Sequence, residues 1–282
     1  MKVKSAFLGA LALLALQGCG PPLAKIDGEL FPDPAADAIT FWGHACCYID
    51  LDGFGIVTDP VFEKKTLIRW RKIPIPPPAA YQHARVILIS HAHPDHLSPQ
   101  TLATFPDDTI ILCPQPSAKY LDDLGMDVRA MRPGERFTFP GGWITAVRAR
   151  HMGGRYSLSA GTDGRALGYV ISSSRGRIFY SGDTNDFWGF GDVGLIYNPD
   201  VALLNINGHL HSDDAVSAAH ATRARTVIPL HFGAYGYFFF GASETPRGHD
   251  KMERLLGPAY KPLRPGESFL LKRSPPSGAP LP

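Results

Sequence analysis

Three features that often classify a protein quickly are scarce in this chain. Cysteine is one, with 4 residues among 282, so the sequence does not describe the disulfide framework of a small secreted protein. Net charge is another, because the formal value of +2 lacks the basic excess that binding to nucleic acid usually requires. Long apolar runs are the third, because the run at residues 6–16 is far too short to cross a bilayer. What remains is a chain long enough for one large core.

The first residues have the layout of an export signal. Two lysines precede the apolar run at residues 6–16, which has the length of a signal-peptide core. Leu16-Gln17-Gly18-Cys19 then resembles a bacterial lipobox, in which Cys19 is the lipidated first residue of the mature protein. Gly20 after it, rather than aspartate, favours sorting to the outer membrane, facing the periplasm. An ordinary secretory signal, which would leave the protein secreted or periplasmic, is the alternative.

The chain therefore divides into four segments. We expect a lipoprotein signal peptide over residues 1–18, a tether over 19–37, one folded domain over 38–273 and a flexible tail over 274–282. Removal of the signal peptide takes away two lysines and no acidic residue, so the formal net charge falls from +2 to 0. This neutrality argues against nucleic acid as a partner. It leaves a small molecule or a lipid as substrate, and the membrane as a partner through the lipid anchor.

The most informative stretch is Ser90-His91-Ala92-His93-Pro94-Asp95-His96. It places four metal-binding side chains directly after an apolar run at residues 86–89. A continuous strand would send neighbouring side chains to opposite faces, whereas a tight loop after the strand aims all four at one point. Imidazole and carboxylate together suit zinc and similar first-row ions. The candidate ligands in this loop are His91, His93, Asp95 and His96.

Three more candidate ligands follow strand-like apolar runs further along the chain. His151 comes after the run at residues 143–150, Asp183 lies in Ser181-Gly182-Asp183-Thr184, and His231 closes the run at 226–230. Taken singly, each is as readily a core histidine or a turn aspartate. Together with the earlier loop, they complete a set of seven.

These seven residues suffice for two zinc ions per chain, although other divalent metals remain open. One ion would take His91, His93 and His151, the other would take Asp95, His96 and His231, and Asp183 would bridge them. Such a pair leaves open positions for a hydroxide and a substrate oxygen, as metal-assisted hydrolysis requires. Structural zinc sites are usually closed tetrahedral ones. The set therefore favours an enzyme over a non-catalytic zinc-containing lipoprotein, which stays as an alternative.

With these residues in place, the chain resembles a known family. The His-x-His-x-Asp-His loop, the later histidine, the Gly-Asp-Thr and the strand-terminal histidine are similar to those of the metallo-β-lactamase fold superfamily. The resemblance implies that residues 38–273 form a hydrolase domain with the four-layer αββα sandwich of that superfamily. The order of expected elements, without the resemblance, supports only an α/β or α+β class.

Further motifs resemble one branch of the superfamily, that of N-acylphosphatidylethanolamine phospholipase D and ascorbate-6-phosphate lactonase-like hydrolases. They are Phe41-Trp42-Gly43-His44-Ala45, Val57-Thr58-Asp59-Pro60-Val61-Phe62, His209-Leu210-His211-Ser212-Asp213-Asp214-Ala215-Val216 and Pro265-Gly266-Glu267-Ser268. Cys46-Cys47 and the aromatic segment at 185–191 depart from the branch. Neither departure touches a ligand, and both leave the substrate open.

A few residues are candidates for roles beside the ions. Asp59 ends a buried strand, where it would accept the second N–H of a ligating histidine and fix its tautomer; a turn aspartate is the alternative. His44 is expected either to support the ligands or to face the substrate, and a core histidine is an equal reading. The resemblance aligns His209 with a histidine near the reacting group of the phospholipase D branch, with His211 as its competitor. Asp95 is expected to orient the attacking hydroxide and accept its proton.

Hydrophobic periodicity predicts many strands with few helices between them. The expected strands cover residues 39–51, 54–59, 85–90, 109–113, 136–139, 143–150, 167–174, 176–181, 201–206, 225–230 and 268–272. A short helix is expected from Ser98, with a proline at its first position, and longer ones over 117–125, 213–222 and 249–256.

The expected activity is that of a dinuclear zinc-dependent hydrolase. The resemblance favours a phosphodiesterase of the phospholipase D-like type, acting on a phospholipid or similar amphipathic phosphodiester. Arg69-Trp70-Arg71-Lys72 would hold a phosphate or meet an anionic membrane surface, and the aromatic segment at 235–240 would contact an apolar part of the substrate. The alternative for both segments is a solvated loop and a cap on the core. The ligands fit lactones and other carbon esters equally well, so a lactonase stays as the alternative activity.

Overall fold

The computed structural model describes residues 31, 34–66, 69–152, 154–155, 166–206, 209–237 and 249–272. The expected signal peptide, the candidate lipidation site Cys19, most of the tether, the tail and residues 238–240 of the aromatic segment lie outside these residues. Within the described part of the chain, no helix has the length and apolar character needed to span a membrane.

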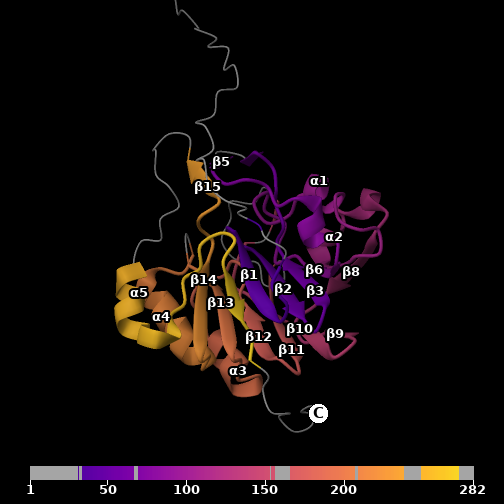
Figure 1. Ribbon diagram of the computed structural model, residues 1–282. Helices are drawn as coiled ribbons and strands as arrows, with labels where there is room; N and C mark the ends of the chain where they lie inside the picture. Colours follow the sequence, from indigo (N-terminus) through magenta and orange to yellow (C-terminus); the bar gives the residue numbers. More distant parts are fainter. Residues whose placement is uncertain are drawn as a thin grey trace, which may run out of the picture.

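Two β-sheets form the centre of the molecule (Figure 1). The first has the strand order β16-β1-β2-β3-β6-β7-β8, and the second has the order β14-β13-β12-β11-β10-β9. The first sheet consists of β1 (Ala38–Gly43), β2 (Cys46–Leu51), β3 (Phe54–Thr58), β6 (Ala84–Leu88), β7 (Ile110–Pro114), β8 (Asp127–Met131) and β16 (Ser268–Leu270). The second consists of β9 (Arg136–Phe139), β10 (Gly142–Arg148), β11 (Leu167–Ser173), β12 (Gly176–Tyr180), β13 (Val201–Asn205) and β14 (Thr226–Leu230). A small third sheet joins β15 (Tyr235–Tyr237), β5 (Arg69–Arg71) and β4 (Lys65–Thr66).

Helices cover the two outer faces of this pair of sheets (Figure 1). Those on the side of the first sheet are α1 (Pro99–Leu102), α2 (Gln115–Ala118) and the 3-10 turns η1 (Pro78–Tyr81) and η2 (Asp122–Leu124). Those on the side of the second are α3 (Gly189–Ile196), α4 (Ser212–Thr222), α5 (His249–Leu256) and the 3-10 turn η3 (Gly257–Ala259). The main core joins the inner faces of both sheets, for example Ile49 and Leu88 with Ile144 and Tyr169. The predicted four-layer αββα sandwich is therefore confirmed.

The two adjacent cysteines show how the strand alternation builds this core. Cys46 belongs to the apolar cluster outside the first sheet, whereas Cys47 belongs to the cluster between the sheets, because neighbouring side chains of a strand point to opposite faces. Both residues and Cys113 are buried free thiols. Burial raises the pKa of Cys113 to about 12. These three residues therefore act as small apolar side chains.

The predicted continuous strand over residues 39–51 is wrong at its centre. Gly43 has a φ of +93° and His44 a φ of +59°, so the chain breaks between β1 and β2, and a side chain on Gly43 would meet a neighbouring carbon at 2.9 Å. The His44 N–H donates to the Phe232 carbonyl at 2.6 Å, and the His44 carbonyl accepts the His231 N–H at 2.6 Å. The break therefore places His44 beside a strand that follows almost 200 residues later, a contact that local periodicity does not encode.

Other elements also differ from expectation. The predicted helix over residues 117–125 is instead the short α2 followed by η2, and Gly125 ends it with a φ of +68°. Neither β8 nor α3 is expected from the sequence. The glycines of α3 make its sequence typical of a loop, because glycine disfavours a helix. One of them has a packing reason: a Cβ on Gly194 would lie 2.2 Å from the Ala221 carbonyl oxygen of α4. Close packing of the two helices therefore requires glycine.

Candidate metal centre

The ends of five strands bring the candidate residues to one edge of the sandwich. The loop after β6 carries residues 91–96, and four further candidates follow β10, β12, β13 and β14, namely His151, Asp183, His209 and His231. Those four strands run in the same direction, because β12, β13 and β14 are parallel and two antiparallel pairings relate β10 to β12. Their C-terminal ends therefore lie at the same edge. The Leu167 N–H donates to the Ser90 carbonyl at 2.8 Å, which joins the loop of the first sheet to this edge.

One group of candidate ligands consists of imidazoles alone. His91, His93 and His151 each offer a ring nitrogen within 4.8 Å of the others, and we call these three residues the first half-site. His91 Nε2 lies 2.9 Å from His93 Nδ1, and His151 Nε2 lies 3.1 Å from the same atom. The structure thus brings together the three imidazoles that the sequence assigned to one ion.

A second group contains the three ligands expected for the other ion and one more histidine. Ligand atoms of His44, Asp95, His96 and His231 also lie within 4.8 Å of one another, and we call these four residues the second half-site. His96 Nε2 and His231 Nε2 are 3.2 Å apart. His44 was expected to support the ligands or face the substrate, but the geometry makes it a candidate fourth ligand.

Asp183 lies between the two half-sites. Its Oδ2 is 3.8 Å from His91 Nε2 of the first half-site and 3.2 Å from His96 Nε2 of the second. Its Oδ1 is 3.5 Å from His231 Nε2 and accepts a hydrogen bond of 2.9 Å from Asn205 Nδ2. A carboxylate placed in this way can contribute one oxygen to each of two ions.

Asp59 anchors the loop that carries the ligands. Its carboxylate accepts the Ser90 N–H at 2.6 Å, the Ser90 hydroxyl at 2.5 Å and the Tyr180 hydroxyl at 2.5 Å. It also lies 2.7 Å from His96 Nδ1, and an N–H at this nitrogen directs the Nε2 lone pair toward Asp183. The hydroxyl of Ser90 is in turn 2.9 Å from His91 Nδ1. One buried carboxylate thus orients a histidine in each half-site.

The donor set fits divalent metal ions on grounds of hydrogen bonding alone. Buried polar atoms normally meet a hydrogen-bond partner of opposite character. In the first half-site, however, three ring nitrogens converge within hydrogen-bond distance. The shared nitrogen, His93 Nδ1, offers either one N–H or one lone pair and can pair with only one of the two nitrogens that face it. A metal cation satisfies converging nitrogen lone pairs and a carboxylate together. A metal centre therefore explains best why these ring nitrogens converge.

Burial keeps the first half-site in the protonation state that metal binding needs. It lowers the pKa of His151 to about 3, and it lowers the pKa of His93 and, strongly, that of His91. Neighbouring imidazoles in the same cluster add to the effect, because a second positive charge nearby disfavours protonation. All three histidines are therefore neutral near pH 7 and present lone pairs.

The second half-site behaves differently. Burial by itself lowers the pKa of His96, but the carboxylates of Asp183, Asp59 and Asp95 raise it well above its usual range. Burial lowers the pKa of His231 well below the usual range, and His44 and His96 lower it further. The pKa of Asp183 is also low: burial would raise it, but His231, His96 and His209 outweigh that effect. In the absence of a metal, a proton on His96 Nε2 thus lies between this nitrogen and the carboxylate of Asp183.

Asp95 is held by a residue that was expected to bind a phosphate or an anionic membrane surface instead. Arg69 Nη1 of β5 donates to Asp95 Oδ2 at 2.8 Å, and His44 Nε2 lies 3.4 Å from the same oxygen. The rest of the basic segment is less available than expected for an anion. Arg71 is buried, and its guanidinium donates to the carbonyls of Val61 and Pro74 at 3.0 and 3.2 Å, so it stabilises the fold.

The two histidines proposed to face the substrate occupy different positions. His209 Nε2 lies 3.4 Å from Asp183 Oδ2, its ring is 4.3 Å from that of His151, and its side chain is 23% exposed. His211 is an exposed residue preceding α4. The geometry therefore places His209, and not its competitor, at the mouth of the centre.

Sequence reasoning missed four residues that shape this centre. Ser90 is the first residue of the histidine-rich motif at residues 90–96. It was not assigned a role, although it directly precedes the first ligand. Tyr180 ends β12, and Asn205 ends β13, so a polar side chain at the end of a buried strand is the signal that would have found them. Arg69 gave only the signal of a basic segment, because its pairing with Asp95 depends on how β5 folds back over the loop.

Comparisons with known proteins agree with this geometry. Residues 55–232, more than half of the chain, match the Beta-lactamase superfamily domain. The chain is 29% identical over 251 residues to the UPF0173 metal-dependent hydrolase of Aeropyrum pernix, covering 82% of this chain and 96% of the relative. The protein of the same name from Methanoregula boonei is 30% identical over 235 residues, covering 82% and 96%. Igni18, a metallo hydrolase from the archaeon Ignicoccus hospitalis, has a similar fold, with a TM-score of 0.61 at 23% identity, covering 82% of this chain and 97% of that one.

Proposed function

This chain belongs to the metallo-β-lactamase superfamily, and from that premise we propose that it is a hydrolase that depends on two zinc ions, one in each half-site. The observation that carries the proposal is the position of Asp183, whose carboxylate lies within 3.8 Å of ring nitrogens from both half-sites. A structural zinc site needs only one closed set of four ligands. Two adjoining sets around one carboxylate support a site for metal-assisted hydrolysis.

Zinc at such a centre lowers the pKa of a water molecule to about 7 and polarises a substrate oxygen. The residues of the chain supply the remaining functions. Asp95 would accept the proton that this water molecule loses, and Arg69 holds the carboxylate of Asp95 in place at 2.8 Å. His209, which is partly exposed and 3.4 Å from Asp183, donates a hydrogen bond to the substrate. Asp59 keeps the His96 ring in one orientation.

The proposed substrate is a phosphodiester with an apolar part, as in phospholipase D-like enzymes. The support is the resemblance of the segments around His44, Asp59 and His209 to that branch, together with the position of His209 at the mouth of the centre. The ligands themselves do not choose between a phosphorus and a carbon electrophile. The substrate therefore has to be tested separately from the metals.

The test compares substrate classes on one zinc-loaded preparation. Bis-p-nitrophenyl phosphate and a long-chain phosphodiester should both be hydrolysed, exhaustive chelation should abolish the activity, and added zinc should restore it. A matched control is Asp186→Asn, because Asp186 is an exposed aspartate three residues from Asp183 and its substitution should leave turnover unchanged. Turnover of lactones or acyl esters alone would replace the phosphodiesterase by a lactonase. Full activity after chelation would contradict the proposal that hydrolysis depends on metal ions.

A lipid anchor is a separate part of the proposal. If Cys19 is acylated, the wild-type protein should be found in the membrane fraction, because several acyl chains on one cysteine anchor a protein firmly. Cys19→Ala should move it to the soluble fraction or leave it unprocessed. An unchanged membrane fraction for a variant whose signal peptide has been cleaved would contradict the lipobox reading and leave the hydrolase proposal intact.

A further inference from the structure

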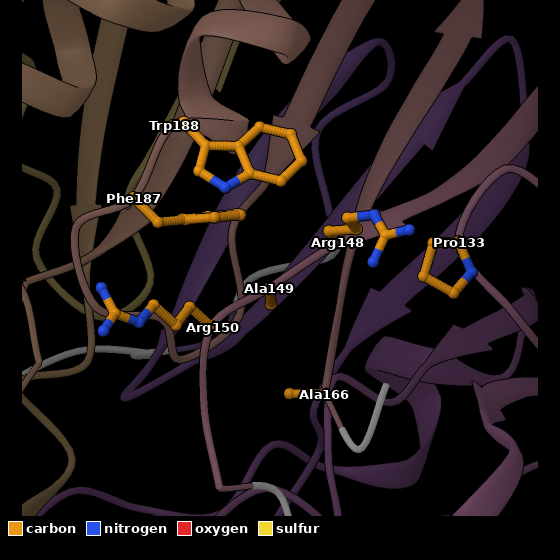
Figure 2. Close-up of a pocket in the computed structure, with 7 residues that line it drawn as sticks. All are labelled: Pro133, Arg148, Ala149, Arg150, Ala166, Phe187 and Trp188. Carbon is orange, nitrogen blue, oxygen red and sulfur yellow. The ribbon is translucent and has the colours of Figure 1, made fainter. Parts of the chain in front are cut away.

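A hollow beside the metal centre has no part in the proposed chemistry. Its volume is 410 Å³, which falls in the range of sites for small molecules. It lies where β10 ends and the chain enters α3, with the Trp188 ring over that of Phe187 (Figure 2). The residues that line it are Pro133, Arg148, Ala149, Arg150, Ala166, Phe187 and Trp188.

A second hollow of 240 Å³ adjoins the first along α3. Pro133, Arg148 and Trp188 line both, so the two form one groove that passes the indole. The far part is mainly apolar, with Val147, Val193 and other apolar residues in its wall. Its only charged lining residues among those described are Arg148, where the hollows meet, and Asp192.

The charges in the groove are unequally distributed. Arg148 is exposed, and its guanidinium makes no hydrogen bond or ion pair with another described residue. Arg150 is directed to the opposite side (Figure 2), where its Nη1 donates to the Asp186 carbonyl at 3.3 Å. An anion is therefore favoured beside Arg148 in the first hollow, whereas the carboxylate of Asp192 disfavours one in the second.

Apolar surface is also left uncovered along this groove. Trp188 is 68% exposed and Ile196 is 52% exposed, whereas most large apolar side chains of the described residues are buried. Aromatic side chains gain much free energy when they are covered by a ligand, and contiguous exposed apolar surface beside a pocket is characteristic of binding sites. The groove thus presents a cation near one end and an apolar wall beyond it.

Hydrogen bonds connect the groove to the metal centre. The Arg150 N–H donates to Thr184 Oγ1 at 2.9 Å, and the Arg150 carbonyl accepts the Asn185 N–H at 3.0 Å. Arg150 immediately precedes His151 of the first half-site, and Thr184 immediately follows Asp183. A ligand in the first hollow therefore lies against the two segments that carry these candidate ligands.

We propose that this groove is a subsite for an amphipathic anion with one linear apolar chain. Arg148 binds the carboxylate or phosphate group, and the chain passes Trp188 and lies along α3 toward Ile196. This assignment rests on the proposed function in so far as the anion is part of the substrate. The binding itself requires neither hydrolysis nor any residue of the two half-sites.

Calorimetric titration of the full zinc-loaded chain tests the binding. The probe is dodecyl phosphate below its micellar concentration, and the reference probes are inorganic phosphate and the neutral dodecyl maltoside. Arg148→Gln should raise the Kd for dodecyl phosphate roughly tenfold, because a charge-assisted hydrogen bond is lost. Trp188→Ala should raise it by a similar factor, and both reference probes should bind more weakly than dodecyl phosphate. The matched control is Arg254→Gln, an exposed arginine of α5, which should leave the Kd within about twofold of wild type.

Both variants alter exposed side chains, so the thermal midpoints should stay those of the wild type and a change in Kd reports the groove. Wild-type affinity for dodecyl phosphate in both Arg148→Gln and Trp188→Ala would overturn the subsite. Equal binding of the phosphate and the maltoside would overturn the role of Arg148.

Kinetics separates this inference from the proposed function. Arg148→Gln should raise KM for a long-chain phosphodiester roughly tenfold and leave the turnover of bis-p-nitrophenyl phosphate unchanged, because a remote contact acts only on substrates that make it. If no phosphodiester is hydrolysed by the wild type, the proposed substrate class fails, while a Kd that depends on Arg148 still supports the subsite. Equal KM values for wild type and Arg148→Gln on the long-chain phosphodiester would show that this substrate does not use the subsite.

Discussion

The two half-sites lie side by side but differ in the groups around them. The first consists of three imidazoles, all with a lowered pKa, so it is neutral and ready for a cation near pH 7. The second places His96 among the carboxylates of Asp59, Asp95 and Asp183, which raise its pKa, so a proton must leave before an ion can bind there. Similar ligand types therefore need not give equal sites. The carboxylates around His96, two of them candidate ligands themselves, make the second half-site compete with protons.

Substitution of the residue shared by both half-sites should have the largest effect. Asp183→Asn keeps the shape of the side chain but removes its negative charge, which faces ring nitrogens on both sides. We expect hydrolysis to fall by roughly a thousandfold or more, because the loss involves several kcal/mol of transition-state stabilisation. Steady-state kinetics with bis-p-nitrophenyl phosphate measures the fall, with Asp186→Asn as the control. Near-wild-type turnover in Asp183→Asn would show that the half-sites do not depend on a shared carboxylate.

Substitutions confined to one half-site should separate the two. His93→Ala removes the nitrogen on which the first half-site converges, and His231→Ala removes one that faces His96 in the second. Each should lower turnover by roughly a hundredfold or more, and saturating zinc should rescue neither. His220→Ala, which alters an exposed histidine of α4, should retain wild-type turnover. If only one of the two half-site variants is impaired, the reaction needs a single ion.

Weakening the anchor should affect stability as well as metal affinity. Asp59→Asn replaces a carboxylate that accepts hydrogen bonds from Ser90 and Tyr180 and faces His96, so we expect a loss of roughly 3 kcal/mol in the free energy of unfolding. Zinc affinity at the second half-site should fall roughly 10- to 100-fold, as for other groups that orient a ligand. Tyr180→Phe removes one donor and should cost about 1 kcal/mol. Denaturant unfolding of the chelated proteins gives the change in the free energy of unfolding for each of the two variants. Equal stability of Asp59→Asn and wild type would contradict the anchoring role.

The smallest expected effect is a difference between the half-sites in the number of protons released when zinc binds. At pH 7 to 8, the histidines of the first half-site should release almost no protons when an ion binds, because their pKa values are lowered and they are already neutral. Apart from any proton lost by bound water, the second step should release about one proton more than the first, because the raised pKa of His96 keeps it protonated in the metal-free protein. Calorimetric zinc titration in buffers of different ionisation enthalpy counts these protons. Equal release at both steps would contradict the assigned difference.

The sequence is sufficient to predict the seven candidate ligands as neighbours, because each follows a strand and strand ends meet at an edge of the sandwich. It does not place His44 in the second half-site, since that contact depends on a left-handed turn and on pairing with a distant segment. Nor does it indicate the link between Arg69 and Asp95, which depends on the path of a short strand in the third sheet. Local patterns thus predict what a strand end carries, whereas contacts between distant loops require the assembled fold.

The elements of the fold divide in the same way. Strands buried on both faces, such as β10 and β11, follow from their continuous apolar runs, and their predicted ranges differ from the structure by only a few residues. The helix α3 is hidden, because its glycines disfavour a helix, and one of them, Gly194, serves the contact with α4. A residue selected for tertiary packing can therefore carry a local preference opposite to the structure that it occupies.

The central claim, that the chain contains two distinct half-sites joined by Asp183, is tested most directly by counting zinc ions with native mass spectrometry. The wild-type chain should hold two ions, His93→Ala and His231→Ala should each hold one, and Asp183→Asn should hold fewer than two at the same free zinc concentration. A wild-type chain that saturates at one ion, with both histidine variants losing that same ion, would contradict the claim.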